Sequence, residues 1–169
     1  MKKLLMGLIV AASLVACTNP KETSTAAAAL PNTSGYTVDS SANIDLVKKS
    51  NTAGSTGDMD TYKSTYSDSA VFHDNLKKAT LSENLEMLAQ FKKAGLSFGI
   101  EYGALWETIN NKANEKGVSH YVLGYLTVTF KKGDKSVKVG QFQIDAVKDG
   151  KIVEEWIVYD PTDLMSLMK

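Results

Sequence analysis

The hydrophobic pattern of the chain changes period near its middle. Apolar residues recur every three to four positions in the first half and at every second position after about residue 97. The first period places side chains on one face of a helix, and the second places them on one face of a strand. The pattern predicts helices at 41–52, 58–66 and 81–94, strands at 70–74, 98–110, 118–131, 136–147 and 151–159, and a short apolar helix after Pro161.

Local signals mark the ends of several of these elements. Gly54 and Gly57 separate the first two helices. Thr80 and Glu83 have the spacing of a capping box, which favours a helix start at residue 81, and Gly95 can end that helix. The segments 132–134 and 148–150 have the composition of hairpin turns. Helices followed by an antiparallel meander indicate an α+β fold, and a curved sheet covered by helices on one face tends to enclose a pocket.

The alternation within the late strands predicts which side chains face that pocket. In the strand 136–147, the apolar residues fall on one face and Gln141, Gln143 and Asp145 on the other. Because apolar side chains favour the interior, we expect the apolar face to be the inner one. The expected pocket residues are Phe72, Phe142, Ile144 and Ile157.

The first 17 residues, MKKLLMGLIVAASLVAC, form a basic end followed by a short apolar run. A membrane-spanning helix needs about 20 apolar residues, so the segment 1–16 is predicted to be a secretory signal peptide. Its end, residues 14–17, resembles the cleavage box of bacterial lipoproteins, in which the Cys thiol carries lipid. The resemblance implies that Cys17 is a membrane anchor in the bacterial cell envelope. The alternative is a plain signal peptide followed by a chance Cys.

Residues 18–35 are rich in Thr, Ser, Ala, Asn and Pro and show no apolar period, which is typical of a flexible tether. We therefore expect a lipidated Cys and tether at 17–35 and one domain at 36–169. All 19 basic residues are Lys, and they balance 19 acidic residues. This neutral balance argues against a nucleic-acid partner, and lipid rather than a basic patch must hold the protein at a membrane.

Motifs for metals and cofactors are missing from the sequence. With one Cys and no His-x-His, His-Glu-x-x-His or Cys-x-x-Cys pattern, no metal site is expected. No Gly-x-Gly-x-x-Gly, phosphate loop or Gly-x-Ser-x-Gly pattern occurs either, so no nucleotide, cofactor or hydrolase nucleophile is expected. His73 and His120 are interpreted as structural residues.

Two segments resemble the nuclear transport factor 2-like superfamily, and its SnoaL-like group in particular. They are residues 57–74, which end in Val-Phe-His-Asp, and residues 149–160, Asp-Gly-Lys-Ile-Val-Glu-Glu-Trp-Ile-Val-Tyr-Asp. The resemblance spans about residues 44–160. It implies a cone-shaped α+β fold in which N-terminal helices pack on a curved antiparallel or mixed sheet and enclose a pocket. It also implies a homodimer through the outer sheet face, for which the expected residues are Tyr121, Tyr125, Gln141 and Gln143.

The same resemblance suggests catalytic residues. Asp74 matches the general base of the ketosteroid isomerase branch, although it can equally open a turn with the residue after it. The Tyr and Asp of that branch's oxyanion hole fall at Ser50 and Phe142, so this pair is absent. The polyketide cyclases of the group use a carboxylic acid in the pocket, and Glu155 is the candidate here. Tyr159 shares its strand face and can assist.

Three functions remain open from the sequence. The first is an envelope lipoprotein that binds a small, largely apolar molecule in the pocket. The second is a cofactor-independent isomerase or cyclase that moves a proton on a carbonyl substrate, with Asp74 as the base. The third is a protein-interaction module that dimerises through the outer face of its sheet.

Overall fold

The computed structural model describes residues 34–168. The predicted signal peptide at 1–16, the predicted lipidation site Cys17 and most of the predicted tether lie outside these residues. The elements, in order, are β1 (Gly35–Val38), α1 (Ala42–Thr56), α2 (Met59–Thr65), β2 (Tyr66–Asp74), β3 (Lys77–Thr80), α3 (Leu81–Lys93), β4 (Leu96–Asn110), β5 (His120–Lys132), β6 (Lys135–Lys148), β7 (Lys151–Tyr159) and α4 (Thr162–Met168).

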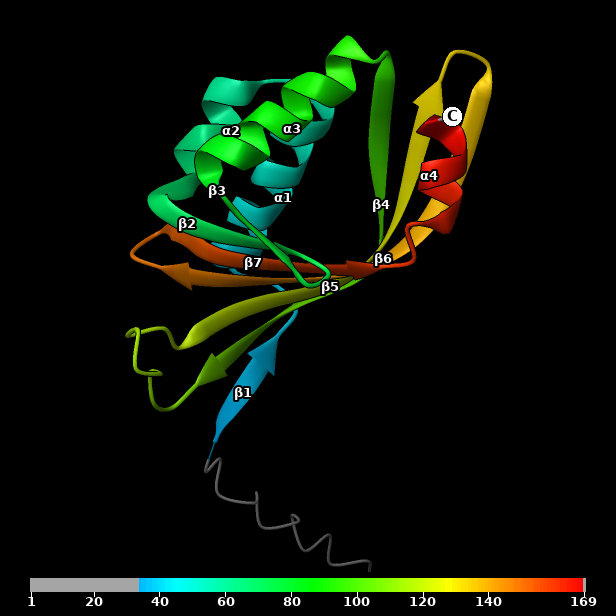
Figure 1. Ribbon diagram of the computed structural model, residues 1–169. Helices are drawn as coiled ribbons and strands as arrows, with labels where there is room; N and C mark the ends of the chain where they lie inside the picture. The colour runs from blue at the N-terminus through cyan, green and yellow to red at the C-terminus, as the bar shows by residue number, and fades with distance from the viewer. Residues whose placement is uncertain (1–33, 169) are drawn as a thin grey trace, which may run out of the picture. The chain divides into compact units, whose positions relative to one another are not determined.

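The strands form one seven-stranded sheet in the order β1-β4-β5-β6-β7-β2-β3. All neighbouring pairs are antiparallel except β2 and β7, which run parallel. Figure 1 shows the long strands β4, β5 and β6 curving round, with α1, α2 and α3 together over one part of the sheet and α4 beside the far part of β6. The predicted α+β class, with helices on a curved and open sheet, is confirmed.

Helix α1 runs further than the sequence predicted because Gly54 does not end it. The Ser41 hydroxyl caps the helix by accepting a hydrogen bond from the backbone N–H of Ile44. Gly54 is buried against the ring of Tyr62, where an added Cβ would lie 3.3 Å from the ring carbons. The helix ends instead at Gly57, whose φ of 79° gives the left-handed cap. Gly54 thus serves close packing between α1 and α2.

Helix α3 begins as the sequence predicted. Thr80 Oγ1 accepts a hydrogen bond from the backbone N–H of Glu83, and the Glu83 carboxylate accepts one from the backbone N–H of Thr80. This reciprocal pair satisfies two backbone donors at the helix start. The strands β1 and β3, which lie at the two edges of the sheet, were not predicted. Each has only four residues, which is too short for a two-residue period to be recognised.

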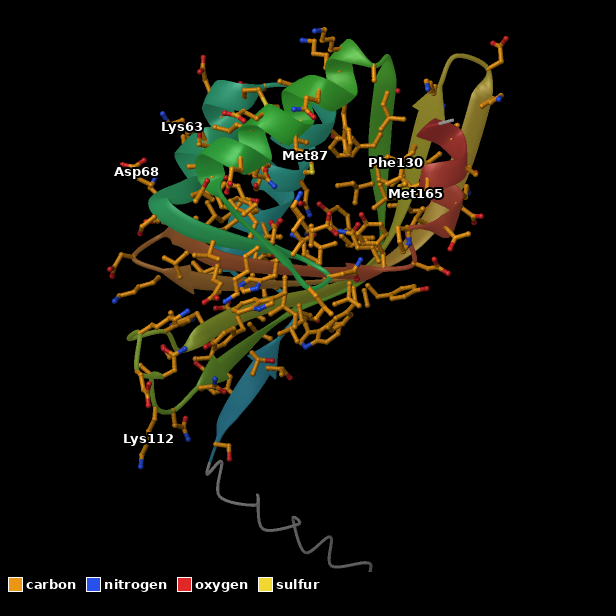
Figure 2. All side chains as sticks on the ribbon, viewed as in Figure 1. Lys63, Asp68, Met87, Lys112, Phe130 and Met165 are labelled. Carbon is orange, nitrogen blue, oxygen red and sulfur yellow. The ribbon has the colours of Figure 1, made fainter. Side chains whose placement is uncertain are left out.

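Two hydrophobic clusters fill the concave side of the sheet. One gathers α1, α2 and β2 around Val47, Phe72 and Ile152, and the other gathers β4, β5, β6 and α4 around Leu126 and Leu164. In Figure 2, Met87 of α3 and Phe130 of β5 point into the space between helices and sheet, whereas Lys63, Asp68 and Lys112 point outward. The pocket described below takes its lining from both clusters.

The inner face of β6 follows an unbroken alternation along the strand. Val139, Gln143, Asp145 and Val147 have the same parity and are all buried. The prediction that Phe142 and Ile144 face the pocket is therefore wrong, and their polar neighbours Gln141, Gln143 and Asp145 face inward instead.

A one-residue bulge lies in β7, where the register pairs Ile152 with Val147 but Glu154 with Ala146 and so gives Val153 no partner on β6. The bulge leaves both Ile152 and Glu155 on the inner side and places Glu155 opposite Asp145.

The outer face of the sheet is correspondingly aromatic. Phe142 packs against Trp106 with ring centroids 6.3 Å apart, and Ile144 lies opposite Trp156, which stacks on His73. Tyr125 of this face is 54% exposed. Gln141 and Gln143 do not belong to it, which corrects their assignment to a dimer surface. A homodimer through this face stays a prediction, now with Trp106 and Phe142 beside Tyr121 and Tyr125.

Candidate functional site

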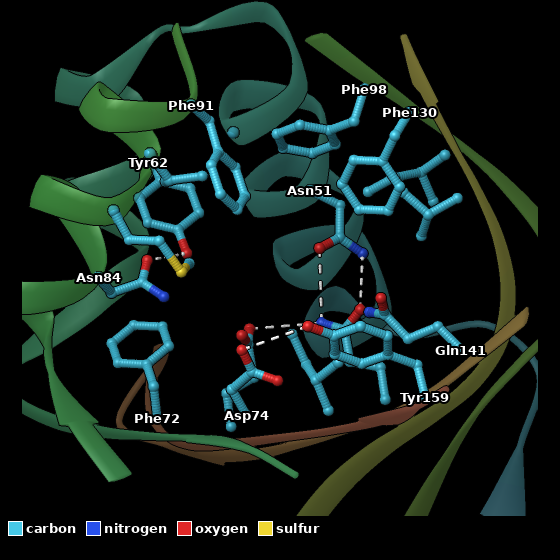
Figure 3. A pocket seen from close by; sticks show the side chains of 18 of the residues that line it. Asn51, Tyr62, Phe72, Asp74, Asn84, Phe91, Phe98, Phe130, Gln141 and Tyr159 are labelled. Carbon is cyan, nitrogen blue, oxygen red and sulfur yellow. Dashed lines mark hydrogen bonds between the residues drawn. The ribbon is translucent and has the colours of Figure 1, made fainter. Parts of the chain in front are cut away.

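A pocket of ≈ 130 Å³ lies between the helices and the concave face of the sheet. Its upper wall is apolar and combines Phe91 of α3, Phe98 of β4 and Phe130 of β5 (Figure 3). The rings of Phe98 and Phe130 have centroids 5.9 Å apart. Leu164 brings α4 to the same pocket. The cavity is thus shaped by segments that are far apart in sequence and joined by the curvature of the sheet.

The floor of the pocket is a polar network rather than the predicted apolar face. Asn51 of α1 donates from Nδ2 to Gln143 Oε1 over 3.2 Å, as the dashed lines of Figure 3 show. Gln143 Nε2 in turn donates to Asp145 Oδ2 over 2.9 Å and lies 3.4 Å from Glu155 Oε2. Tyr66 donates its hydroxyl proton to the same Glu155 oxygen over 2.7 Å. The network links α1, β2, β6 and β7 at one point.

Two carboxyl groups, Asp145 and Glu155, lie opposite each other in this network. They are 0% and 4% exposed, respectively, and neither belongs to an ion pair among residues 34–168. Burial raises the pKa of Asp145 well above its ordinary value, and the negative charge of Glu155 raises it further. Burial also raises the pKa of Glu155, while hydrogen bonds from Tyr66 and Asp145 offset part of that rise. The pair therefore retains a proton where exposed carboxyls would be ionised.

Aromatic rings surround the Glu155 carboxyl. Tyr62, Tyr66 and Phe72 form a continuous run with successive ring centroids 4.9 Å apart, and Phe72 lies opposite Glu155 in the β2–β7 register. Burial raises the pKa of both tyrosines well above the ordinary value, and the Glu155 charge adds to this effect. Both hydroxyls therefore stay protonated as donors, Tyr66 to Glu155 and Tyr62 to Asn84 Oδ1 over 2.9 Å.

A third carboxyl group, Asp74, lies at the end of β2 on the pocket wall. Tyr159 donates its hydroxyl to Asp74 Oδ2 over a long 3.4 Å (Figure 3). Burial and the nearby Asp74 charge raise the pKa of Tyr159 to about 12. Asn75, which follows with φ of 52°, accepts a hydrogen bond from the backbone N–H of Tyr159. The residue after Asp74 thus makes the predicted turn, while Asp74 itself faces the pocket.

The structure brings most of the residues proposed from the sequence to this pocket. Its lining includes Phe72, Asp74, Glu155, Ile157 and Tyr159, but neither Phe142 nor Ile144. Sequence reasoning missed Asn51, Gln143 and Asp145. The signal for the last two is that they share their strand face with Val139 and Val147, which are buried. The extra residue Val153 of β7 then brings Glu155 opposite Asp145.

The chemistry that this arrangement offers is proton transfer and hydrogen bonding. A buried carboxyl pair and a Tyr–Asp pair converge on an apolar cavity, where perturbed titration is typical of a functional site. Among residues 34–168, no group of three or more His, Cys, Asp or Glu residues is arranged to hold a metal ion. No helix within the same residues is long and apolar enough to cross a membrane.

No protein-family model and no curated protein matches the chain. Solved structures with a similar fold include an LEH-like epoxide hydrolase of M. tuberculosis, with a TM-score of 0.58 and 17% identity over 75% of this chain and 89% of that one. PrhC of Penicillium brasilianum has a TM-score of 0.59 and 15% sequence identity, over 75% of this chain and 85% of that one. A putative polyketide cyclase of Xanthomonas campestris has a TM-score of 0.53 and 12% sequence identity, over 76% of this chain and 97% of that one. The chain has the nuclear transport factor 2-like fold of these proteins.

The buried carboxyl pair predicts a specific effect of pH on stability. Because the pKa of Asp145 is raised in the folded protein, its contribution to stability is full below the unfolded pKa and is lost as the pH rises through the folded pKa. In Asp145→Asn the amide still accepts from Gln143 and can donate to Glu155. We expect the free energy of unfolding of the variant, relative to that of wild type, to rise by about 1–3 kcal/mol as the pH increases from about 4 to about 8. Denaturant unfolding at each pH measures this difference.

The matched control for this experiment is Asp68→Asn, because Asp68 is an exposed carboxylate on β2. Its unfolding free energy should follow that of wild type at every pH. If the Asp145→Asn and wild-type curves were parallel across this range, the raised pKa of Asp145 would be ruled out.

Proposed function

We propose that this protein binds a small, largely apolar molecule that carries one polar group. The observation that supports this is the pairing of an aromatic wall with a polar floor in one pocket. The apolar part of a ligand gains from leaving water against Phe91, Phe98 and Phe130, and the floor can bind its polar group. An epoxide hydrolase and a putative polyketide cyclase share the fold, which supports a function inside this pocket.

The size of the cavity limits the ligand. A closed apolar cavity of roughly 150 Å³ holds a benzene ring. The pocket here measures ≈ 130 Å³ and is not sealed, so one ring or a short branched chain fits inside while the rest of a larger ligand extends through the opening. The polar groups that line the pocket are carboxyl, amide and hydroxyl groups and one imidazole, and no Lys is among the lining residues.

The first test is native mass spectrometry of the protein purified from its own host. We expect wild type to carry an extra mass that is lost on denaturation, because a ligand buried in this pocket survives gentle ionisation. Leu88→Trp places an indole in the cavity from α3 and should remove the extra mass. Ala89→Trp, at the next and exposed position of the same helix, should retain it. A wild-type protein with no bound mass, or equal masses in both variants, contradicts the proposal.

A second candidate function is acid–base catalysis on the bound molecule. The observation that favours it is the buried pair of facing carboxyl groups, Asp145 and Glu155, since Glu155 also lines the cavity and burial raises the pKa of both groups. A carboxyl group in this setting can donate a proton to a ligand oxygen or remove one from carbon next to a carbonyl. Asp74, with Tyr159 beside it, is a second acid–base group on the pocket wall.

Deuterium incorporation tests this catalytic function without knowledge of the reaction. The ligand identified by mass spectrometry is incubated with the protein in D₂O, and carbon-bound deuterium is then measured in the released ligand. We expect incorporation with wild type and a loss of at least about 100-fold with Glu155→Gln, as for removal of a general acid or base. Glu154→Gln changes the neighbouring residue, which binds Lys116 and His73 outside the pocket, and should behave as wild type. An unlabelled ligand with wild type would leave binding alone as the function.

We also propose that the protein is anchored to a membrane of the bacterial cell envelope by lipid on Cys17. The support is the sequence alone: a basic end, an apolar run and the single Cys of the chain at residue 17. Several acyl chains on one residue give firm attachment, where one chain gives weak and reversible binding.

Detergent phase partitioning and fatty-acid labelling in the bacterial host test this anchor. Wild type should enter the detergent phase and incorporate a labelled fatty acid, because the thiol of Cys17 carries the lipid. Cys17→Ser should do neither, while retaining the fold of the domain. Equal labelling of both proteins would be incompatible with lipidation at this residue.

A further inference from the structure

Carboxyl groups gather at the pocket without a cationic partner. Asp74 and Glu155 line the cavity, and Asp145 lies opposite Glu155 across the β6–β7 pair. The three ion pairs among residues 34–168 all lie elsewhere, between His73 and Glu154, Lys116 and Glu154, and His120 and Glu107. A buried carboxylate without a counter-charge is costly, so such a group needs either a proton or a cation from outside the protein.

The single basic side chain in the lining does not supply that charge. His73 turns its Nε2 to Glu154 over 2.8 Å and stacks on Trp156, both on the outer side of the sheet. No Lys lines the pocket, and the sequence contains no Arg. An anionic ligand would therefore find no Lys or Arg in the lining to neutralise it and would lie beside the carboxyl groups.

Glu155 is also placed to contact a ligand directly. Both hydrogen bonds that it accepts, from Tyr66 and Gln143, go to Oε2, which leaves Oε1 for a ligand or for the proton shared with Asp145. The side chain is 4% exposed and lines the cavity, so its remaining free surface belongs to the pocket. Tyr66 donates its hydroxyl to Glu155, and Phe72 lies opposite Glu155 in the β2–β7 register. The ring of Tyr62 follows Tyr66 in the same aromatic run. A carboxylate with aromatic side chains close by is a setting that a desolvated organic cation favours.

We propose that the polar group of the ligand is a cation, an amine or quaternary ammonium held between Glu155 and the neighbouring aromatic side chains of Tyr62, Tyr66 and Phe72. This inference rests on the proposed binding function and specifies its ligand class. The apolar wall of Phe91, Phe98 and Phe130 then takes the hydrocarbon part of the molecule. On binding, the cation replaces the proton that the carboxyl pair otherwise retains.

The test uses four probes of nearly equal size that differ in the polar end: benzylammonium, benzyl alcohol, ethylbenzene and benzoate. Binding to the purified protein is measured by calorimetry at neutral pH. We expect benzylammonium to bind about tenfold more tightly than benzyl alcohol, because a desolvated cation gains from both the carboxylate and the rings. Benzoate should bind most weakly of the four.

Two variants separate this explanation from a general preference for amines. Glu155→Gln keeps the shape of the side chain and an acceptor for Tyr66, and it should bring benzylammonium to the level of benzyl alcohol or below. Glu154→Gln removes a carboxylate one residue away on the opposite face and should preserve the tenfold preference.

The outcomes distinguish the two proposals. If benzyl alcohol and ethylbenzene bind wild type while benzylammonium binds no better, the cation proposal is overturned and pocket binding stands. A preference that survives in Glu155→Gln also overturns it. If none of the four probes binds, the binding function fails together with the inference built on it.

Discussion

The antiparallel register of β6 and β7 places two carboxyl groups, Asp145 and Glu155, face to face and out of water. Their environment constrains the rest of the pocket, because each oxygen that has lost water needs a donor, a proton or a counter-charge. Gln143 and Tyr66 supply donors, and Asn51 holds Gln143 in place from helix α1. The position of α1 over the sheet is therefore tied to the state of the acidic pair. Polar groups specify the inner surface of this fold as much as its two hydrophobic clusters do.

The fold was largely predictable from local patterns. The strand β7 and the start of α3 carry strong signals, a two-residue period in one case and a capping box in the other, and both were placed correctly. The predicted end of α1 was wrong because Gly54 was interpreted as a helix stop. Gly54 lies inside the helix, where the lack of a Cβ lets the ring of Tyr62 pack against it, and this contact is not visible in the sequence. The strands β1 and β3 were missed because four residues are too few to show a two-residue period. Strand β1 is defined by pairing with β4, which is distant in sequence, and β3 by pairing with β2 at the edge of the sheet.

The site was predictable only in part, and the reason is geometric. Glu155, Ile157 and Tyr159 follow the alternation of β7 and were placed on the pocket side from sequence alone. The strand β6 shows the opposite outcome, because the hydrophobic rule favoured Phe142 and Ile144 as inner residues. The other face of β6 also carries apolar residues, Val137, Val139 and Val147, and it is the inner one. The energetic cost of an outward Phe142 is reduced by its packing on Trp106. Because both faces of β6 are partly apolar, hydrophobicity alone could not rank them, and the inward position of Gln143 and Asp145 became visible only with the strand pairing.

The edge strand β1 has a mechanical consequence. Tension applied along the chain from its N-terminal side enters the described domain at Gly35 and acts first on the ladder that pairs Gly35–Val38 with β4. The hydrogen bonds of an antiparallel pair lie across the strands, so a pull along β1 loads them together in shear. Strands β4 and β5 separate this ladder from the acidic floor on β6 and β7. The acidic floor of the pocket therefore lies two strands away from a load that enters through β1.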